Sequence, residues 1–469
     1  MWISGSPGAG KSAIASSVVS DLCEKVSSVD FFFKSGDAYW GNPASLWAAI
    51  AVQLANIDTS FRQSIVPAMR DGKASASKTD VNLHFRHLFE VPLQQDPAES
   101  SIQPMVVIVD ALDEAGPPAQ RGMLLSTLSK WAYFPPTFKL LVTSRREDDI
   151  EFSFQNISHC HFHLYTGDQV ALAAQTSVDI ELFFQKEFGN LAKRLPRLEP
   201  GWPSSKMIDQ LTTKAAGLFI WATTVAKLVQ NDAQPTELLN EILSGSNKEM
   251  NLDDLYNKVL SHVFGPKPNN RAIQTFQKII GAIIVTKVPL NCVQLQKLLC
   301  LSDSDTSVDF ILRDLSSVVS TDKSTQLIHI CHQSFIDFLT DAKWGNEWFY
   351  INCEQHNRHL VQYCLQVMNA DLRFNICGLK TSHHFNKDIP NLAECIETNI
   401  SPQLKYSSYF WAEHMRETPI LDSSSNMQKD LQKFLHNNLL SWLEVLSFTK
   451  EVPIAAGALN LLSKRLLVS

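Results

Sequence analysis

A glycine-rich segment near the N-terminus has the residue types and spacing of a phosphate-binding loop. It fits the pattern G-x-x-x-x-G-K-S/T at every fixed position. Glycines let the main chain fold around phosphate oxygens with its N–H groups pointing inward, and the helix that follows presents its positive end. We expect Lys11 to contact the β- and γ-phosphates and the Ser12 hydroxyl to bind Mg²⁺. The predicted nucleotide-binding residues of this loop are Gly5, Ser6, Pro7, Gly8, Ala9, Gly10, Lys11 and Ser12.

A group of acidic residues follows the apolar run Met105–Val109. A β-branched run that ends in an acid predicts a buried central strand with a carboxylate at its C-terminal edge, where open α/β sheets bind ligands. We therefore predict that Asp110 is a second partner of the Mg²⁺ ion. Asp113 and Glu114 follow closely enough to polarise an attacking water, and the sequence leaves open which of them does so. The alternative is an ordinary strand followed by an exposed acidic turn.

Two adjacent arginines follow a further predicted strand, Lys139–Val142. An arginine at this edge can reach the γ-phosphate and stabilise the charge that is transferred. We choose Arg145 over Arg146 as the catalytic candidate, although adjacency leaves the choice open and a solvated basic turn is the alternative.

A cluster of histidines lies in the run His159–Leu164. On a strand, His159, His161 and His163 would share one face, which can suit zinc. No further Cys or carboxylate ligand lies at a useful spacing, so we expect an edge strand rather than a metal site.

Strands and helices alternate over the first 165 residues or so. Short apolar or aromatic runs predict the strands, and between them apolar residues recur at spacings of three or four. Strands separated by amphipathic helices imply right-handed crossovers and a parallel sheet with helices on both faces, the α/β fold class of P-loop NTPases. The predicted strands are Val29–Phe33, Met105–Val109, Lys139–Val142 and His159–Leu164, and the helical stripes are Ile14, Val18 and Leu22, then Leu46, Ile50, Leu54 and Ile57.

Helical periodicity dominates after Thr166. It runs through Phe184, Phe188, Leu191 and Leu195, then from Met207 to Val229 and from Leu252 to Phe264. A short strand at Leu327–Cys331 among helices is typical of a winged helix, and Ser423–Ser425 is the expected flexible loop. We predict four domains: a P-loop NTPase domain at 1–165, a helical domain at 166–264, a winged helix at 271–343 and a C-terminal helical domain at 344–469.

Composition narrows the class of protein further. The net charge is -7 and no Lys/Arg run occurs, so nothing indicates binding to nucleic acid or to an anionic membrane. No apolar stretch reaches the roughly 18 residues that span a bilayer. The basic region with which a signal peptide begins does not follow Met1, so we expect no signal peptide. The 9 scattered cysteines indicate buried free thiols in a reducing compartment. We expect a cytoplasmic protein.

Taken with these motifs, the sequence resembles the NACHT class of signal-transduction ATPases (STAND-class P-loop NTPases), specifically the fungal NOD-like proteins with a nephrocystin-like NTPase domain. The resemblance covers almost the whole chain. Beyond the glycine-rich loop, the resemblance is carried by Asp30–Phe33 with Gly36 and Asp37, Val109–Glu114, Thr143–Arg145, Gly217–Ala222, His332–Leu339, Tyr409–Ala412 and Trp442–Leu446. One position departs from the family: Phe219 stands where many relatives have a proline that touches the nucleotide.

The resemblance implies a signalling switch of the fungal innate-immunity or heterokaryon-incompatibility type. Such a switch is held closed by a diphosphate nucleotide, opens on exchange and then assembles with copies of itself. It implies ATP or ADP with Mg²⁺, GTP remaining possible. His332 falls on the winged-helix histidine that, in relatives, reaches the β-phosphate of ADP, so it is a nucleotide-binding candidate. The effector and sensor modules of such switches are absent from this sequence, which favours a fragment of a longer product or a divergent short form.

Three hypotheses for the function remain after this comparison. The leading one is a nucleotide-operated switch with weak nucleoside-triphosphatase activity. The second is a binding-only or truncated scaffold that holds nucleotide structurally without turnover. The third is a metabolic kinase that uses the same loop, but the long helical remainder offers no obvious lid. Asp113 and Glu114 favour the first, and phosphate release compared with the bound nucleotide separates it from the second.

Overall fold

The chain forms two compact units in the computed structural model. The first contains Met1–Val259, Ser316–Val318 and His332–Phe335, and the second contains Leu260–Leu315, Val319–Cys331 and Ile336–Ser469. Cys23, Gly36 and the expected loop Ser423–Ser425 lie outside the described residues. The structure describes residues 1–22, 27–35, 37, 39–71, 80–93, 103–155, 157–164, 170–244, 251–301, 308–381, 383, 385–418 and 426–466.

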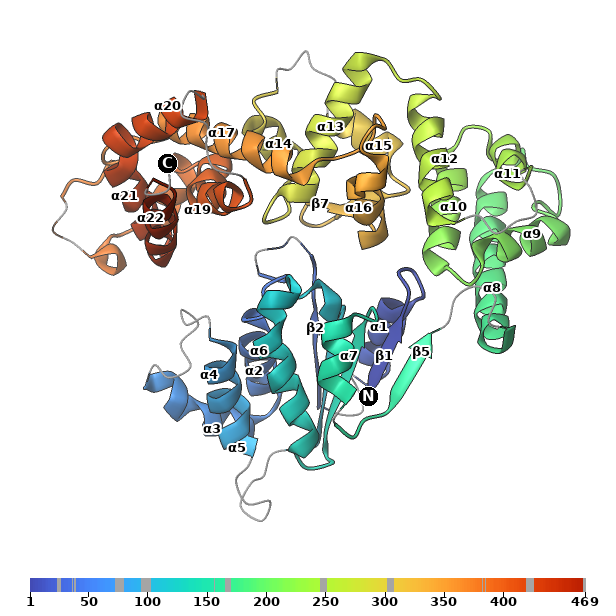
Figure 1. Cartoon of the computed structure of the whole chain (residues 1–469), viewed down its shortest axis with the longest axis horizontal. Helices are drawn as coiled ribbons and strands as arrows, with labels where there is room; N and C mark the ends of the chain where they lie inside the picture. The colour runs from blue at the N-terminus through green and yellow to red at the C-terminus, as the bar shows by residue number, and fades with distance from the viewer. Residues whose placement is uncertain are drawn as a thin grey trace. The chain divides into compact units, whose positions relative to one another are not determined.

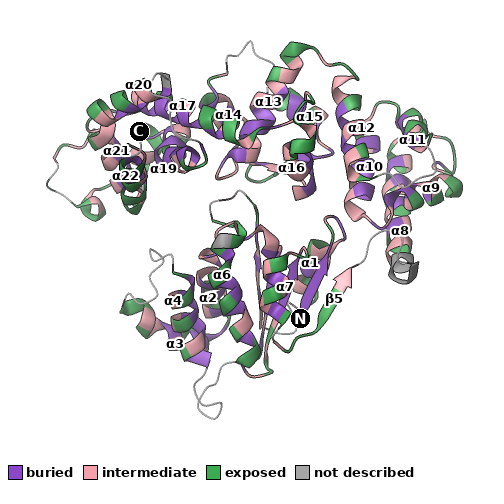
Figure 2. Ribbon diagram, viewed as in Figure 1, coloured by how far each residue is buried: buried purple, intermediate pink, exposed green. Residues whose placement is uncertain are grey.

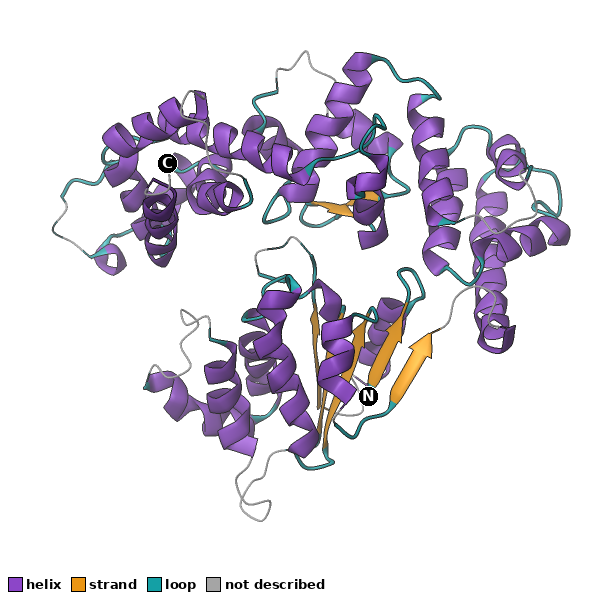
Figure 3. Cartoon of the chain, viewed as in Figure 1, coloured by secondary structure: helices purple, strands orange, loops and turns teal. Residues whose placement is uncertain are grey.

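A five-stranded sheet with the order β2-β3-β4-β1-β5 forms the centre of the first unit (Figures 1 and 3). All its pairings are parallel, so the carboxyl ends of the strands meet at one edge of the sheet. The strand that leads into the glycine-rich loop lies between β4 and β5. The four predicted strands are confirmed, with ends shifted by one or two residues: β2 is Ser27–Phe32, β3 Met105–Asp110, β4 Phe138–Ser144 and β5 His161–Leu164, and they are joined by β1, Trp2–Gly5.

Helices cover both faces of this sheet, which confirms the predicted α/β fold class. Side chains alternate along each strand: Ile108 packs with helix α1 (Lys11–Leu22) on one face, whereas Val107 and Val109 pack into the larger core on the other. Fully burying each such side chain contributes about 1.5–3 kcal/mol. The larger core contains residues of α2 (Ser45–Ile57), α3 (Thr59–Arg70), α4 (Val81–Phe85), α6 (Pro118–Lys130) and α7 (Asp148–Gln155).

Burial along the sheet follows strand position. β1 is buried along its whole length, whereas β5 is exposed or half-buried, as Figure 2 shows. β5 is therefore an edge strand, as expected for the histidine-rich run. The buried apolar face of α2 ends one turn earlier than predicted, because Leu54 is buried while Ile57, at the end of the helix, is 52% exposed.

The rest of the first unit is helical. The helix predicted from Met207 to Val229 is two helices, because Ala216 and Gly217 have φ of +49° and +78°. Left-handed residues end a right-handed helix, and apolar periodicity does not reveal them. The break lets a new helix begin at Phe219. The helices here are α8 (Val170–Arg194), α9 (Ser205–Ala215), α10 (Phe219–Asn231), α11 (Pro235–Leu243) and α12 (Leu252–Phe264), the last of which ends in the second unit.

The described residues of the second unit form helices and one antiparallel strand pair, β6 (Val319–Thr321) with β7 (Ile328–Ile330). Its aromatic-rich part packs Trp411, Phe434 and Trp442 edge-to-face. None of the helices within the described ranges is long and apolar enough to cross a membrane. The helices are α13 (Asn270–Val285), α14 (Cys292–Leu298), α15 (Val308–Asp314), α16 (Gln333–Thr340, which begins in the first unit), α17 (Cys353–Asp371), α18 (Leu392–Asn399), α19 (Pro402–Arg416), α20 (Asn426–Lys433), α21 (Leu439–Phe448) and α22 (Pro453–Leu466).

The described cysteines are free thiols, but they are not uniformly buried. Cys364 and Cys377 are buried, whereas Cys160 and Cys300 are exposed. Cys160 immediately precedes the edge strand β5 and Cys300 lies in a turn after α14 with φ of +49°. The expectation of buried thiols is therefore wrong for these two residues.

Candidate nucleotide-binding site

The glycine-rich loop joins the end of β1 to the start of α1. Gly8 and Gly10 adopt φ of +78° and +88°, a region that L side chains rarely enter. A Cβ atom at Gly8 would lie 2.1 Å from Cγ2 of Ile220, which is closer than any real contact. Gly8 is therefore required both by its backbone conformation and by the close approach of α10.

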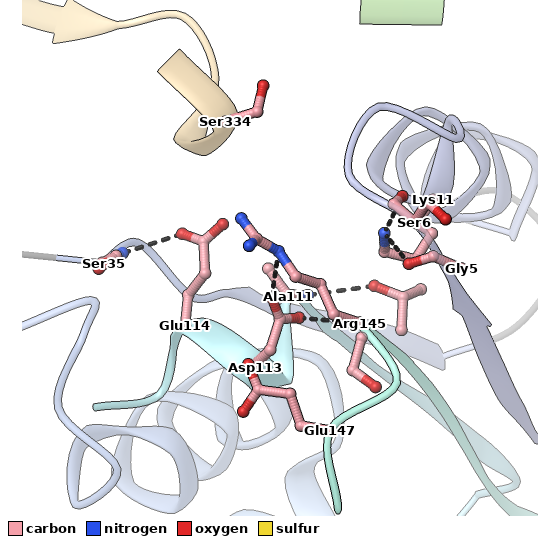
Figure 4. A network of polar contacts seen from close by, with 12 residues as sticks. Gly5, Ser6, Lys11, Ser35, Ala111, Asp113, Glu114, Arg145, Glu147 and Ser334 are labelled. Atoms are coloured by element: carbon pink, nitrogen blue, oxygen red, sulfur yellow. Dashed lines mark hydrogen bonds and ion pairs between the residues drawn. The ribbon is translucent and has the colours of Figure 1, made fainter. Parts of the chain in front are cut away.

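Lys11 is the first residue of α1, and its side chain folds back over the loop (Figure 4). Its Nζ donates hydrogen bonds to the carbonyl oxygens of Gly5 at 2.8 Å and Ser6 at 2.9 Å. Burial lowers the pKa of Lys11 from its ordinary value. The loop thus holds an ammonium group at the positive end of a helix, an arrangement suited to phosphate oxygens.

Asp110 ends β3 and is buried at 3% exposure. Burial raises the pKa of its carboxyl group, while hydrogen bonds from Thr143 and Ser12 and the charge of Lys11 lower it. Ser12 and Asp110, the two predicted Mg²⁺ partners, thus lie beside each other. A hydroxyl beside a carboxylate is the all-oxygen chemistry that Mg²⁺ prefers, so these residues fit the ion.

Thr143 is a residue of this site to which the sequence analysis assigned no role. Its hydroxyl donates to Asp110 and accepts a hydrogen bond from the main-chain N–H of Ala111 at 3.1 Å. Ala111 has φ of +56°, so the chain turns sharply directly after Asp110. The hydroxyl of Thr143 in the neighbouring strand β4 thus stabilises both the carboxylate and the turn.

Asp113 and Arg145 form a close pair beside this turn (Figure 4). The carboxylate of Asp113 accepts a hydrogen bond from the main-chain N–H of Arg145 at 2.8 Å and lies 3.1 Å from its Nε. The other arginine considered, Arg146, pairs instead with Glu151 at 2.8 Å. Both Asp113 and Arg145 line the cavity described below, and Arg146 is not among its lining residues.

Glu114 ends the short 3₁₀ turn Leu112–Glu114. Its Oε2 accepts a hydrogen bond from the main-chain N–H of Ser35 at 2.9 Å. Burial raises the pKa of Glu114 to about 7, only partly opposed by that hydrogen bond. A carboxylate whose pKa is near neutrality is suited to accept a proton from water at physiological pH.

A cavity of about 190 Å³ brings most of the candidate residues together. All its lining residues belong to the first unit. Phe219, Ile220 and Thr223 of α10 form part of the wall, so the phenylalanine that replaces the proline of many relatives does face this space. Among the predicted residues, Gly5, Ser6, Ala9 and Asp110 do not line it, whereas Pro7, Gly8, Gly10, Lys11, Ser12, Asp113, Glu114, Arg145 and His332 do.

His332 lines the cavity together with Gln333. The imidazole Nδ1 accepts a hydrogen bond from the main-chain N–H of Ser334 at 3.1 Å and lies 2.6 Å from the Ser334 hydroxyl. His332 therefore caps the N-terminus of α16 with its side chain.

Arg121 is a buried cation that the sequence did not reveal. It lies on α6 at 1% exposure, and its Nε donates to Asp149 at 3.0 Å. The same guanidinium donates to the main-chain carbonyl of Asp113 and to the carboxylate of Glu147. One side chain thus joins the segment after β3 to the segment after β4, the two segments that carry the acids and Arg145.

The histidines of β5 make contacts with the sheet itself. Ser4 bonds to His161 Nε2 at 2.8 Å and to His163 Nδ1 at 2.7 Å, and Trp2 stacks on His161 with ring centroids 4.1 Å apart. Burial lowers the pKa of both histidines. Within the part of the chain that the structure describes, no group of three or more His, Cys, Asp or Glu residues could hold a metal ion.

Two solved structures match the chain with low structural similarity. The chain is similar to a RuvB mutant of Thermotoga maritima, with 11% identity, a TM-score of 0.28 and coverage of 72% of this chain and 87% of that one. It is also similar to Drosophila ORC bound to DNA, with 14% identity, a TM-score of 0.29 and coverage of 68% and 75%. These scores are too low to carry an argument, so the fold class rests on the sheet and the glycine-rich loop.

Comparison with sequences is more informative. Residues 1–145 match the family described as Nephrocystin 3, N-terminal. Over 99% of its length the chain is 23% identical to the vegetative incompatibility protein HET-E-1 of Podospora anserina, and it spans 34% of that protein. Together with the loop geometry, these matches confirm the expected resemblance to the fungal NOD-like proteins with a nephrocystin-like NTPase domain, and they support a P-loop NTPase that binds nucleotide.

Proposed function

We propose that the chain is a nucleotide-operated signalling switch. It binds ATP or ADP, with GTP as the alternative, together with Mg²⁺; it hydrolyses triphosphate slowly and assembles with copies of itself when the nucleotide changes. The observation that carries this proposal is the pairing of Lys11 and His332 as lining residues of one cavity, although they are far apart in the sequence. A simple nucleotide-binding loop has no need for that histidine, whereas a switch requires a group whose contact depends on the conformation.

The loop, Lys11, Ser12 and Asp110 supply the binding part of this function. Main-chain N–H groups and Lys11 would hold the phosphates, and the Ser12–Asp110 pair would hold Mg²⁺, which supplies positive charge against the phosphate oxygens. The existing hydrogen bonds of Lys11 to two loop carbonyls keep its ammonium group at the loop before nucleotide arrives.

Glu114 is the acid that we assign to the attacking water. Both carboxylate oxygens of Asp113 already contact Arg145, whereas Glu114 accepts a hydrogen bond from the main chain of Ser35 and has a pKa near neutrality. Arg145 would stabilise charge on the transferred phosphoryl group. The expected rate lies well below typical enzyme turnover of about 10 per second, because a switch must persist in each state.

His332 is the latch in this proposal. Its imidazole would donate a hydrogen bond to the β-phosphate of ADP in the closed form only, so its free energy would enter the closed–open equilibrium directly. The predicted domains at 1–165, 166–264, 271–343 and 344–469, including the winged helix, are the parts that would rearrange. The expected partners are nucleotide and further copies of the chain, without nucleic acid, and the expected compartment is the cytoplasm.

A binding-only scaffold is the second candidate function. The pKa of Glu114 is compatible with this candidate as well, since a carboxyl group with a pKa of about 7 is partly protonated at neutral pH and a protonated carboxyl cannot polarise water. Steady-state release of phosphate from Mg·ATP by the parent chain separates the two. Slow but measurable release supports the switch, whereas no release with nucleotide retained supports the scaffold.

The latch is tested by the variant His332→Ala. Loss of a hydrogen bond to a charged group costs about 1.5–3 kcal/mol, so ADP should dissociate about 10- to 150-fold faster. Self-association at a fixed protein concentration should rise. The matched control is His436→Ala, an exposed histidine in the second unit. A lower melting temperature of the nucleotide-free variant with an unchanged ADP release rate would show that His332 is only a helix cap.

A further inference from the structure

A chain of hydrogen bonds leads from the latch histidine to a buried tyrosine on another helix. Tyr256 of α12 is fully buried, and its hydroxyl lies 2.8 Å from the hydroxyl of Ser334. Ser334 is also buried, and its hydroxyl lies 2.6 Å from Nδ1 of His332. All three residues belong to the first unit, and Figure 4 shows Ser334 among the polar residues of the site.

The direction of each hydrogen bond follows from the main chain. The N–H of Ser334 can only donate, and it donates to Nδ1 of His332 at 3.1 Å. Nδ1 is therefore an acceptor, so the hydroxyl of Ser334 also donates to it. The lone pairs of that hydroxyl are then left to accept the hydroxyl hydrogen of Tyr256. The bonds thus run in one direction, from Tyr256 through Ser334 to His332.

The hydrogen bond from the main-chain N–H of Ser334 determines the tautomer of the imidazole. A neutral imidazole whose Nδ1 accepts must carry its proton on Nε2. Only a protonated ring nitrogen can donate to a phosphate oxygen, whereas a ring nitrogen with a lone pair would face that oxygen with like partial charge. Aligned hydrogen bonds also polarise one another, so the outer hydroxyl strengthens the inner contact.

We infer that Tyr256 is a positioning residue, which acts through the hydroxyl of Ser334 to hold the imidazole of His332 in the orientation from which Nε2–H donates to the β-phosphate of ADP. This inference rests on the proposed function, in which His332 contacts the nucleotide. Neither Tyr256 nor Ser334 lines the cavity, so we assign their effect on the nucleotide to the imidazole. The ring of Tyr256 packs on Phe335 with centroids 5.0 Å apart, and a phenylalanine at position 256 keeps that packing.

Release of fluorescent N-methylanthraniloyl-ADP into excess unlabelled ADP measures the effect. Removing one hydroxyl from such a chain loses about 0.5–1.5 kcal/mol, so Tyr256→Phe should speed release about two- to tenfold. Ser334→Ala removes the direct donor and should speed release at least as much. In the double variant Tyr256→Phe/His332→Ala, release should match that of His332→Ala, because the tyrosine no longer has an imidazole to position.

Tyr406→Phe is the matched control. Tyr406 is also buried and its hydroxyl lies 2.8 Å from Nε2 of His414, but both residues belong to the second unit and neither lines the cavity. This control should lower the melting temperature and leave ADP release unchanged.

The outcomes separate this inference from the proposed function. Faster release in Tyr256→Phe that disappears in the His332→Ala background supports the positioning role. Unchanged release in Tyr256→Phe, with faster release in His332→Ala, overturns the positioning role and leaves the latch intact. Equal acceleration by Tyr256→Phe in both backgrounds also overturns it, since the tyrosine would then act through packing. Unchanged release in both single variants overturns the latch and the inference together.

Discussion

Asp113 and Arg145 contact each other twice, through the main-chain N–H of Arg145 at 2.8 Å and its Nε at 3.1 Å. One carboxylate thus holds both the backbone and the side chain of the arginine that follows β4. Glu114, the adjacent acid, makes a different contact, with the main-chain N–H of Ser35. Two acids that are equivalent in the sequence therefore occupy distinct environments, and different roles follow for them.

Exchange of each acid for its amide tests these roles. Glu114→Gln should keep the affinity for Mg·ATP within about twofold and slow phosphate release about 10²-fold or more, the usual contribution of a positioned base. Asp113→Asn should loosen Arg145 and lower the melting temperature as well as the rate. Parallel measurements of affinity and phosphate release decide the matter. If Glu114→Gln hydrolyses normally while Asp113→Asn does not, the role belongs to Asp113.

The pKa of Glu114 also predicts a pH dependence of stability in the nucleotide-free protein. Burial raises this pKa from 4.5 to about 7, so the group's contribution to stability is fully present below about pH 4.5 and is lost as the pH rises through 7. Glu114→Gln removes this loss. The variant should be more stable than the parent at about pH 8, by up to about 3 kcal/mol, and should show no such gain near pH 4.5. Urea denaturation at the two pH values measures it, and a difference that does not vary with pH would refute the assignment.

Gly8→Ala should damage the loop for two separable reasons. The left-handed conformation costs about 1–2 kcal/mol for a residue with a Cβ atom, and that atom would lie 2.1 Å from Ile220. We expect a lower melting temperature and at least about tenfold weaker ATP binding. Adding Ile220→Ala should relieve the collision but not the backbone strain. Gly122→Ala is the control, because it has open space around it on α6 and should stabilise the helix by about 0.5–1 kcal/mol. Equal stability of Gly8→Ala and the parent would contradict the loop geometry.

Arg121 should matter more than its position on α6 suggests. Its loss leaves the carbonyl of Asp113 and two carboxylates without their buried donor, and breaking a buried pair typically costs about 3–5 kcal/mol. Because Glu147 and Asp149 are 35% and 27% exposed, we expect Arg121→Met to lower the free energy of unfolding by about 3 kcal/mol. Arg121→Lys should not restore it, since lysine lacks the planar fork. The control Arg146→Met, which breaks the more exposed pair with Glu151, should cost at most about 1 kcal/mol. An equal loss of unfolding free energy in the two methionine variants would contradict this role of Arg121.

Much of the fold and part of the candidate site could be predicted because their signals are local. The glycine-rich loop is contiguous, and β-branched runs such as Met105–Val109 predict buried strands wherever they occur. The parallel sheet then requires Gly5, Asp110 and Ser144 to end at one edge, so the candidates come together without further information.

The missed features depend on partners that lie far away in the sequence. Arg121 reads as an ordinary helix surface residue until Glu147 and Asp149 fold against it. The contact between Tyr256 and Ser334 could not be predicted for the same reason, since it joins α12 to the start of α16. The break at Ala216 was missed because a left-handed residue leaves no trace in apolar periodicity.

Equilibrium binding of Mg·ATP to the parent chain and to Lys11→Ala tests the central claim most directly. The substitution removes the ammonium group that lies within 2.9 Å of two loop carbonyls and leaves the loop backbone in place. Loss of this charged contact should cost about 1.5–3 kcal/mol, so the dissociation constant should rise about 10- to 150-fold. Lys130→Ala, at a partly exposed lysine on α6, should bind as the parent does. Equal affinity of Lys11→Ala and the parent for Mg·ATP would contradict the assignment of this loop as the nucleotide site.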